Sequence, residues 1–246
     1  MNNVSYYILS ALAVLIILTL HEFAHGYTAY KLGDNTARNM GRLTLNPIAH
    51  LDPFGALCLV LFHFGWAKPV PIDPRNFKKP KRDFALTALA GPLFNIILAF
   101  LSAFLYLLLL SVFSKINFAS ELVYKIALNT LNFVFIFHSI NIGLGIFNLI
   151  PVPPLDGSRV LGVILPPKAY FGIMRHERKI YWVLISWLLL GTYVYRAALS
   201  VPVISNSPVL SGIARFFSLS NILGDLFSLL SEAMLDFWRL IPFLNI

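Results

Sequence analysis

Charged residues are scarce in this 246-residue chain, and cysteine is almost absent. Only 12% of the residues are charged, whereas 58% are hydrophobic, and the mean hydropathy is +0.75. A soluble domain has an apolar share of about one half and a charged share of about one quarter, so this composition excludes an ordinary soluble fold. Cys58 is the only cysteine, which excludes an internal disulfide bond and a cysteine-rich zinc site. The composition indicates an integral membrane protein.

Acidic residues are scarcer than basic ones, with 11 Asp and Glu against 19 Lys and Arg, and the formal net charge is +8. A nucleic-acid-binding protein gathers its cations on a water-exposed surface. Here they occupy short loops between long apolar runs, which is the pattern that sets the orientation of a membrane protein. We therefore expect membrane lipids around the chain and no nucleic-acid partner.

Four charge-free apolar runs predict membrane-spanning helices, because a span needs about 20 apolar residues. These runs cover residues 1–20, 84–114, 126–155 and 180–195. The run 54–66 is shorter and is flanked by proline and glycine, which favours a short re-entrant hairpin. The predicted fold is an all-α membrane protein, a multi-pass helical bundle with about four to six membrane segments.

The two ends of the chain are both apolar, but they differ in how many charged residues they carry. The first apolar run lacks a basic N-terminal region, so we interpret it as a retained helix and not as a signal peptide. Residues 207–246 are apolar but carry five charged residues, which fits either an interfacial amphipathic helix or an irregular last span. We divide the chain into an intramembrane core, 1–200, and a C-terminal amphipathic or membrane-associated segment, 201–246.

Lysines and arginines concentrate in two loops, 68–82 and 159–179. Two predicted spans separate these loops, so both loops lie on one membrane face, which the positive-inside rule makes cytoplasmic. The N-terminus is then outside the cell membrane. Residue 21 lies near the cytoplasmic end of the first helix, because twenty helical residues rise about 30 Å.

A metal-binding pattern follows the first apolar run, in His21-Glu22-Phe23-Ala24-His25. Residues four apart lie on one face of a helix, so the two imidazoles can reach a single metal ion. Glu22 is placed beside them to take a proton from water. Imidazoles and a carboxylate are costly in hydrocarbon, so their presence at this depth favours a functional site.

A tetrahedral zinc site of this kind needs one more protein ligand and one open position. The best candidate is Asp156, which follows the third apolar run within the segment 148–157. The prolines of this segment must end the helix and Gly157 permits a turn, so the carboxylate can leave the helical register and face a cavity. The predicted orientation puts Asp156 and His21 near the same membrane face. A turn or helix-capping role for Asp156 is the alternative.

The two motifs, at 21–25 and 148–157, resemble those of the site-2 protease family of intramembrane zinc metalloproteases. The segments 41–47, 50–55 and 91–95 also resemble that family. Apolar segments fill most of the interval between the two motifs, so the resemblance is to a minimal form without a PDZ domain.

The resemblance implies roles for individual residues. It makes His21, His25 and Asp156 the ligands of Zn²⁺. It makes Glu22 the residue that activates the hydrolytic water, and it places Asn148 near the substrate or the oxyanion.

The resemblance also places a small membrane-inserted β element near residues 41–52. Within it, apolar Leu43 and Leu45 alternate with polar Arg42 and Thr44. A transmembrane helix hides its peptide bonds in its own hydrogen bonds, so a substrate must unwind locally, and an exposed strand edge can receive the extended chain. We expect Leu43 and Thr44 to contact the substrate.

Other polar residues in the apolar runs have structural interpretations beside functional ones. Gly91 and Pro92, with Asn95, fit either a bent or opened helix near the site or close helix packing. His138 fits an interhelical hydrogen bond better than a second metal site. His50 fits a loop role better than metal ligation.

The predicted function is hydrolysis of peptide bonds within or next to transmembrane segments of other membrane proteins, as in regulated intramembrane proteolysis. The expected partners are transmembrane substrates and membrane adaptor or regulatory proteins. A metal-binding transporter is one alternative, although no inverted repeat is visible. An inactive family member that acts as a scaffold is the other, and the intact set of Glu22 and three ligands argues against it.

Overall fold

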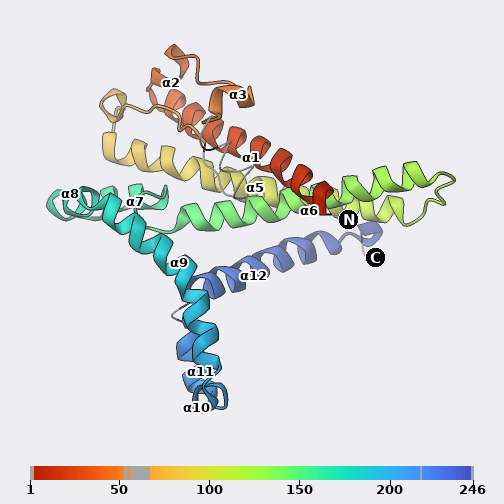
Figure 1. Ribbon diagram of the computed structural model, residues 1–246. Coiled ribbons are helices and arrows are strands. Elements are labelled where there is room, and N and C mark those ends of the chain that lie inside the picture. Colours follow the sequence, from red (N-terminus) through yellow and green to blue (C-terminus); the bar gives the residue numbers. More distant parts are fainter. Residues whose placement is uncertain (1–2, 53–54, 56–66, 217, 245–246) are drawn as a thin grey trace.

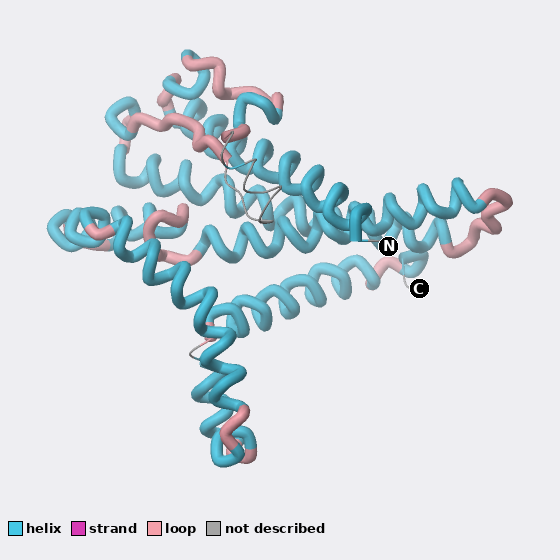
Figure 2. The backbone as a smooth tube through the Cα atoms, in the orientation of Figure 1, coloured by secondary structure: helices cyan, strands magenta, loops and turns pink. Residues whose placement is uncertain are grey.

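The computed structural model describes residues 3–52, 55, 67–216 and 218–244. In the described residues the chain forms helices joined by short loops (Figure 2). The helices are α1 (Asn3–Leu32), α2 (Thr36–Asn39), α3 (Pro47–His50), η1 (Pro74–Asn76), α5 (Pro80–Phe113), α6 (Glu121–Leu149), α7 (Gly157–Ile164), α8 (Pro167–Arg175), α9 (Glu177–Leu199), α10 (Pro202–Ser205), α11 (Pro208–Phe216), α12 (Leu219–Arg239) and η2 (Pro242–Leu244).

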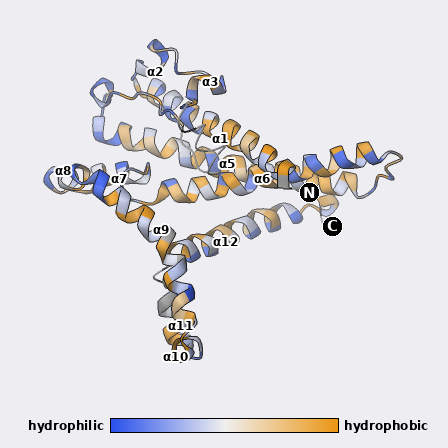
Figure 3. Cartoon of the chain, viewed as in Figure 1, coloured by the Kyte–Doolittle hydropathy of each residue, from blue (hydrophilic) through white to orange (hydrophobic). Residues whose placement is uncertain are grey.

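Four of these helices, α1, α5, α6 and α9, are long and apolar enough to cross a membrane. They coincide with the four predicted runs and confirm the all-α, multi-pass fold. Figure 3 shows their hydrophobic residues along most of their length, with hydrophilic residues gathered around α8. The first helix extends to Leu32, well beyond the charge-free run, so its polar motif lies within the helix.

The core of the bundle lies between α1, α5 and α6, which run side by side (Figure 1). Ala99 and Ala103 of α5 pack on Ile142 and Ile146 of α6. Small residues at these positions let the helix backbones approach closely, which is how helices associate when lipid weakens the hydrophobic driving force. The close approach of these helices brings distant segments of sequence to one site.

The C-terminal helix α12 packs on the same core. Met234 is buried in it, and the indole Nε1 of Trp238 donates a hydrogen bond to the Phe100 carbonyl at 2.9 Å. His138 Nδ1 donates to the Ala99 carbonyl at 2.8 Å and its Nε2 lies 3.0 Å from Ser231 Oγ, which confirms the expected interhelical role of His138. The division of the chain at residue 200 stays a prediction.

The prediction of a β element near residues 41–52 is wrong for the residues that the structure describes. This segment forms turns and the short helix α3, and its pairing is a single antiparallel bridge between Leu51 and Ala67. Pro47 lacks an N–H for a strand ladder, and the Asn46 side chain accepts a hydrogen bond from Ile48 N at 3.1 Å, so a helical turn begins there. The predicted hairpin at 54–66 falls almost entirely outside the described residues.

A buried carboxylate, Asp34, ties the end of α1 to the loop before α5. It accepts hydrogen bonds from Thr36 N at 3.0 Å, from Asp73 N at 2.8 Å and from Asn76 Nδ2 at 2.8 Å. Burial opposes ionisation, but hydrogen bonds from Thr36, Asn76 and the Asp73 backbone hold the pKa of Asp34 below its usual value. The carboxylate therefore stabilises the folded chain when it is ionised.

Asp34→Asn is expected to lower the free energy of unfolding by about 2–3 kcal/mol at pH 7, because buried donors lose a charged acceptor. A lowered pKa in the folded state gives stability that is present above the unfolded pKa of about 3.9 and is lost as pH falls below it. The difference in melting temperature between wild type and variant should therefore shrink from pH 6 to pH 3. The control is Asp236→Asn, an exposed carboxylate, and an equal loss of stability in that variant would contradict the prediction.

Candidate metal centre

The motif at residues 21–25 lies inside α1, where His21 and His25 are each only 5% exposed. Their side chains share one face of the helix, and the two Nε2 atoms are 3.0 Å apart. Helical periodicity alone brings these two nitrogens together, as the sequence predicts.

Asp156 reaches the same point from a different part of the chain. After α6 ends at Leu149, a proline-rich turn leads into α7, and Asp156 is the residue before the first turn of α7. Its Oδ2 lies 3.2 Å from His21 Nε2 and 3.3 Å from His25 Nε2. Its side chain makes no capping hydrogen bond to α7, so the capping alternative for Asp156 is not what the structure shows.

The three ligand atoms form a nearly equilateral triangle with edges of 3.0, 3.2 and 3.3 Å. Ligand atoms that lie 2.0–2.1 Å from a tetrahedral zinc are about 3.3–3.4 Å apart from one another. The donor set of two imidazoles and one carboxylate also suits zinc, and three electron-pair donors this close favour a cation between them. The residues therefore fit a zinc ion with one position left open.

The ring of His25 is oriented by the backbone of α5. Its Nδ1 lies 2.8 Å from the Thr87 carbonyl oxygen, and because a carbonyl only accepts, Nδ1 carries the proton. The lone pair is then on Nε2, the atom that faces His21 and Asp156. An outer hydrogen bond of this kind is typical of histidines that bind metals.

Two glycines permit the close approach of the chain at this site. A Cβ on Gly91 would lie 2.4 Å from His25 Nε2 and 2.7 Å from His21 Cε1. A Cβ on Gly157 would lie 2.4 Å from the Leu149 carbonyl oxygen, so only glycine allows the turn beside Asp156. For Gly91 the structure favours close helix packing over an opened helix, since α5 continues through this position.

Glu22 is held by the loop that precedes α5. The backbone N–H of Val70 donates to Glu22 Oε2 at 2.7 Å. The loop is in turn fixed by the guanidinium of Arg42, which donates to the carbonyls of Lys68 at 2.8 Å and Pro69 at 3.2 Å. The carboxylate of Glu22 thereby keeps one orientation beside the two histidines.

The remaining predicted site residues lie in the loop before α3 and in the last turn of α6. Leu43 packs with Val70 against Gly26, the residue after His25. Thr44 lies further along the same loop, where its carbonyl is 2.8 Å from His50 Nε2, in keeping with a loop role for His50. Asn148 is half-buried in the last turn of α6.

Sequence reasoning missed the two backbone groups that orient the site, the Thr87 carbonyl and the Val70 amide. Backbone groups are present at nearly every residue, so no sequence signal marks them. Gly91 was visible in the segment 91–95, although its contact with both histidines required the packing of α5 on α1.

Comparison with known proteins supports a zinc metalloprotease. The family model described as peptidase family M50 matches residues 9–190. YwhC of Bacillus subtilis (strain 168) is 43% identical over 172 residues, which cover 68% of this chain and 76% of YwhC. No solved structure matches the chain significantly.

Two more distant relatives match a similar share of the chain at 28% identity. They are Rip2 of Mycolicibacterium smegmatis, over 68% of this chain and 61% of that protein, and MJ0392 of Methanocaldococcus jannaschii, over 68% of this chain and 38% of that protein. The chain thus spans less than two thirds of these two relatives. All three names contain the words zinc metalloprotease. The chain belongs to peptidase family M50, and it is a zinc metalloprotease of the site-2 protease type.

Proposed function

We propose that this metalloprotease cleaves peptide bonds within or next to the transmembrane segments of other membrane proteins. In this proposal His21, His25 and Asp156 hold the zinc ion, and Glu22 is the catalytic base. The observation that carries it is the triangle of ligand atoms, with edges of 3.0–3.3 Å, two of which belong to a helix apolar enough to span a membrane.

The depth of the motif supports a reaction inside the bilayer. The candidate span in α1 runs from Val4 to Leu32. At about 1.5 Å per residue, this span exceeds the roughly 30 Å of a hydrocarbon core, and His21 lies about 26 Å from its start, so the motif falls within the candidate span. The basic loops 68–82 and 159–179 make the nearer face cytoplasmic, so we place the site toward the cytoplasmic side.

The residues of the chain divide the chemistry between them. A bound zinc ion supplies Lewis-acid activation of water and of the scissile carbonyl. Glu22 accepts a proton from the attacking water and returns it to the leaving amine. The Val70 N–H on Oε2 holds the carboxylate so that its second oxygen is the one that can take the proton.

A helical substrate must unwind before its peptide bond can enter such a site. Leu43 and Thr44 are our candidates for contact with the unwound segment, because their loop is non-helical and packs on α1 beside His25. Asn148 is a further candidate, at the end of α6 and close in sequence to Asp156. Membrane adaptor proteins remain expected partners in substrate selection.

Gly91→Ala is expected to lower zinc affinity at least about tenfold, because the added methyl group collides with the imidazole of His25. Competition with a chelating dye measures the affinity. Gly143→Ala on α6 is the matched control, since nothing lies within 4 Å of a Cβ at that position. Unchanged zinc affinity in Gly91→Ala would count against the placement of the ion.

The proposed function is tested with the purified chain in liposomes that also contain a single-span model protein. We expect cleavage that stops with a chelator and returns with zinc, and mass spectrometry should place the cut within or beside the transmembrane segment. Cuts confined to soluble loops, or cleavage that persists without metal, would contradict the proposal. Metal flux without cleavage would instead indicate a transporter.

A further inference from the structure

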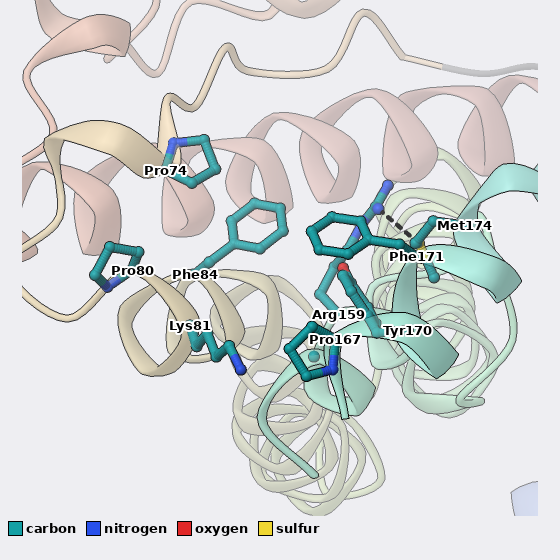
Figure 4. A pocket seen from close by; sticks show the side chains of 10 residues that line it. Pro74, Pro80, Lys81, Phe84, Arg159, Pro167, Tyr170, Phe171 and Met174 are labelled. Carbon is teal, nitrogen blue, oxygen red and sulfur yellow. Dashed lines mark hydrogen bonds between the residues drawn. The ribbon is translucent and has the colours of Figure 1, made fainter. Parts of the chain in front are cut away.

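A cavity of about 370 Å³ lies outside the metal centre, between the start of α5 and the helices α7 and α8. Its walls are mainly apolar and aromatic, and Figure 4 shows Phe84 from α5 facing Phe171 and Tyr170 from α8. Two cationic side chains, Lys81 and Arg159, complete the lining. The cavity thus combines an apolar interior with two positive charges.

The cavity lies at the level where the chain changes from charged to apolar. Lys81 is in the first turn of α5, and the apolar run of that helix begins at Phe84, one turn later. On the opposite wall, Phe171 is 67% exposed, although it is large and apolar. Such a boundary between charged and apolar sequence is where a span meets the lipid headgroups.

The surroundings of the cavity are strongly basic. The ranges 68–83 and 159–179 contain eleven Lys and Arg but three Asp and Glu. Each of the three carboxylates has an arginine partner: Arg75 for Asp73, Arg82 for Asp83 and Arg159 for Glu177. The eight cationic residues in excess of the carboxylates give these two ranges a net positive charge, which attracts an anion.

Arg159 is held at the wall of the cavity in a way that leaves it able to bind an anion. Its guanidinium lies over the Phe84 ring, 5.8 Å from the centroid, and Nη1 is 3.2 Å from Met174 Sδ. Its ion pair with Glu177 is long, at 3.6 Å, and both side chains are partly exposed, so that pair contributes little. A guanidinium suits bidentate binding of a phosphate group.

We propose that this cavity binds an anionic phospholipid, with its headgroup attracted by the cationic side chains of the lining, Lys81 and Arg159, and an acyl chain against the aromatic wall. Basic pockets between membrane helices on the cytoplasmic side suit such headgroups. An acidic peptide fits less well, because its backbone N–H and C=O groups would lack partners on apolar walls. The binding itself does not depend on the proposed proteolytic function.

The site is tested by native mass spectrometry of the purified full chain in a neutral detergent. Phosphatidylglycerol and phosphatidylcholine with identical acyl chains are titrated separately, and the dissociation constant of the first bound lipid is measured. We expect at least about tenfold tighter binding of phosphatidylglycerol. Lys81→Gln combined with Arg159→Gln should abolish this preference.

A matched control removes the same two charges outside the cavity, in Lys78→Gln combined with Lys179→Gln, and should keep the preference. Phe171→Glu puts a carboxylate on the wall at an exposed position and should weaken phosphatidylglycerol binding at least tenfold. Unchanged melting temperatures verify that each variant is folded.

Any one of four results would overturn the proposal. Lys81→Gln with Arg159→Gln could retain the full preference, or the control pair could lose it equally, which would indicate diffuse surface charge. Competition by soluble glycerol 3-phosphate as effective as that by the lipid would indicate a free phosphate site. Displacement of the lipid by a soluble acidic peptide at similar concentration would indicate a peptide site.

Discussion

Glu22→Gln is expected to abolish cleavage of a membrane substrate and to leave zinc binding intact. The amide oxygen of glutamine can still accept the Val70 N–H, so the side chain keeps its place. The amide cannot take a proton from water, and the loss of a general base typically slows a reaction about 10²–10⁴-fold. We expect a loss of this size in the cleavage rate, measured with the reconstituted single-span substrate, and an unchanged ratio of zinc to protein.

The matched control is Glu121→Gln, which removes a carboxylate from an exposed pair with Lys125 at the start of α6. This variant should cleave at the wild-type rate. Full activity in Glu22→Gln would show that another group acts as the base. Loss of zinc together with activity would instead place Glu22 among the groups that hold the ion.

Asp156→Ala is expected to weaken zinc binding more than about 100-fold, although the whole motif at 21–25 stays intact. Loss of an outer hydrogen-bond partner of a ligand costs about 10–100-fold, and a direct ligand should cost more. The two histidines would be left with half of a tetrahedral shell. Competition with a chelating dye measures the affinity, and cleavage should fall with it.

Asp52→Ala provides the comparison, because Asp52 also lies in a polar segment that resembles the family and accepts a hydrogen bond from Gly55 N at 2.8 Å. Its removal should leave zinc affinity unchanged. Equal zinc affinity in Asp156→Ala and wild type would mean that the third ligand lies elsewhere in the chain.

The features that the sequence predicted well depend on local rules. The long apolar runs predicted α1, α5, α6 and α9, because length and composition suffice for a span. Helical periodicity predicted the shared face of His21 and His25. The search for a third ligand pointed to Asp156, which lies 3.2 and 3.3 Å from the two histidines, and its role as a ligand stays a prediction. The positions of the lysines and arginines predicted that Asp156 and His21 lie near the same membrane face. Their side chains are 3.2 Å apart, and the orientation of the chain in the membrane stays a prediction.

The features that the sequence predicted poorly depend on contacts between distant residues. The charge-free run gave no end point for the first helix beyond residue 20, and α1 continues to Leu32 and stops before Gly33, which has a φ of 111°. The place of α12 depends on contacts such as that of Trp238 with Phe100, which no local pattern encodes.

The family resemblance, together with the alternating pattern near residue 43, predicted a β element, but the described residues form a turn, and a short helix begins at Pro47. Alternation is a weak signal over so short a segment, because strand preference depends on neighbouring strands more than on the residues themselves. The loop nevertheless reaches α1, where Leu43 packs against Gly26.

Zinc K-edge absorption of the purified chain tests the central claim most directly, namely that two histidines of α1 and Asp156 hold one zinc ion. We predict four nitrogen or oxygen donors at about 2.0–2.1 Å, with scattering from two imidazole rings. In Asp156→Ala, loaded with zinc at high concentration, the carboxylate contribution should be lost and the imidazole signal should stay. A sulfur donor at about 2.3 Å, or an identical spectrum for wild type and Asp156→Ala, would contradict the account.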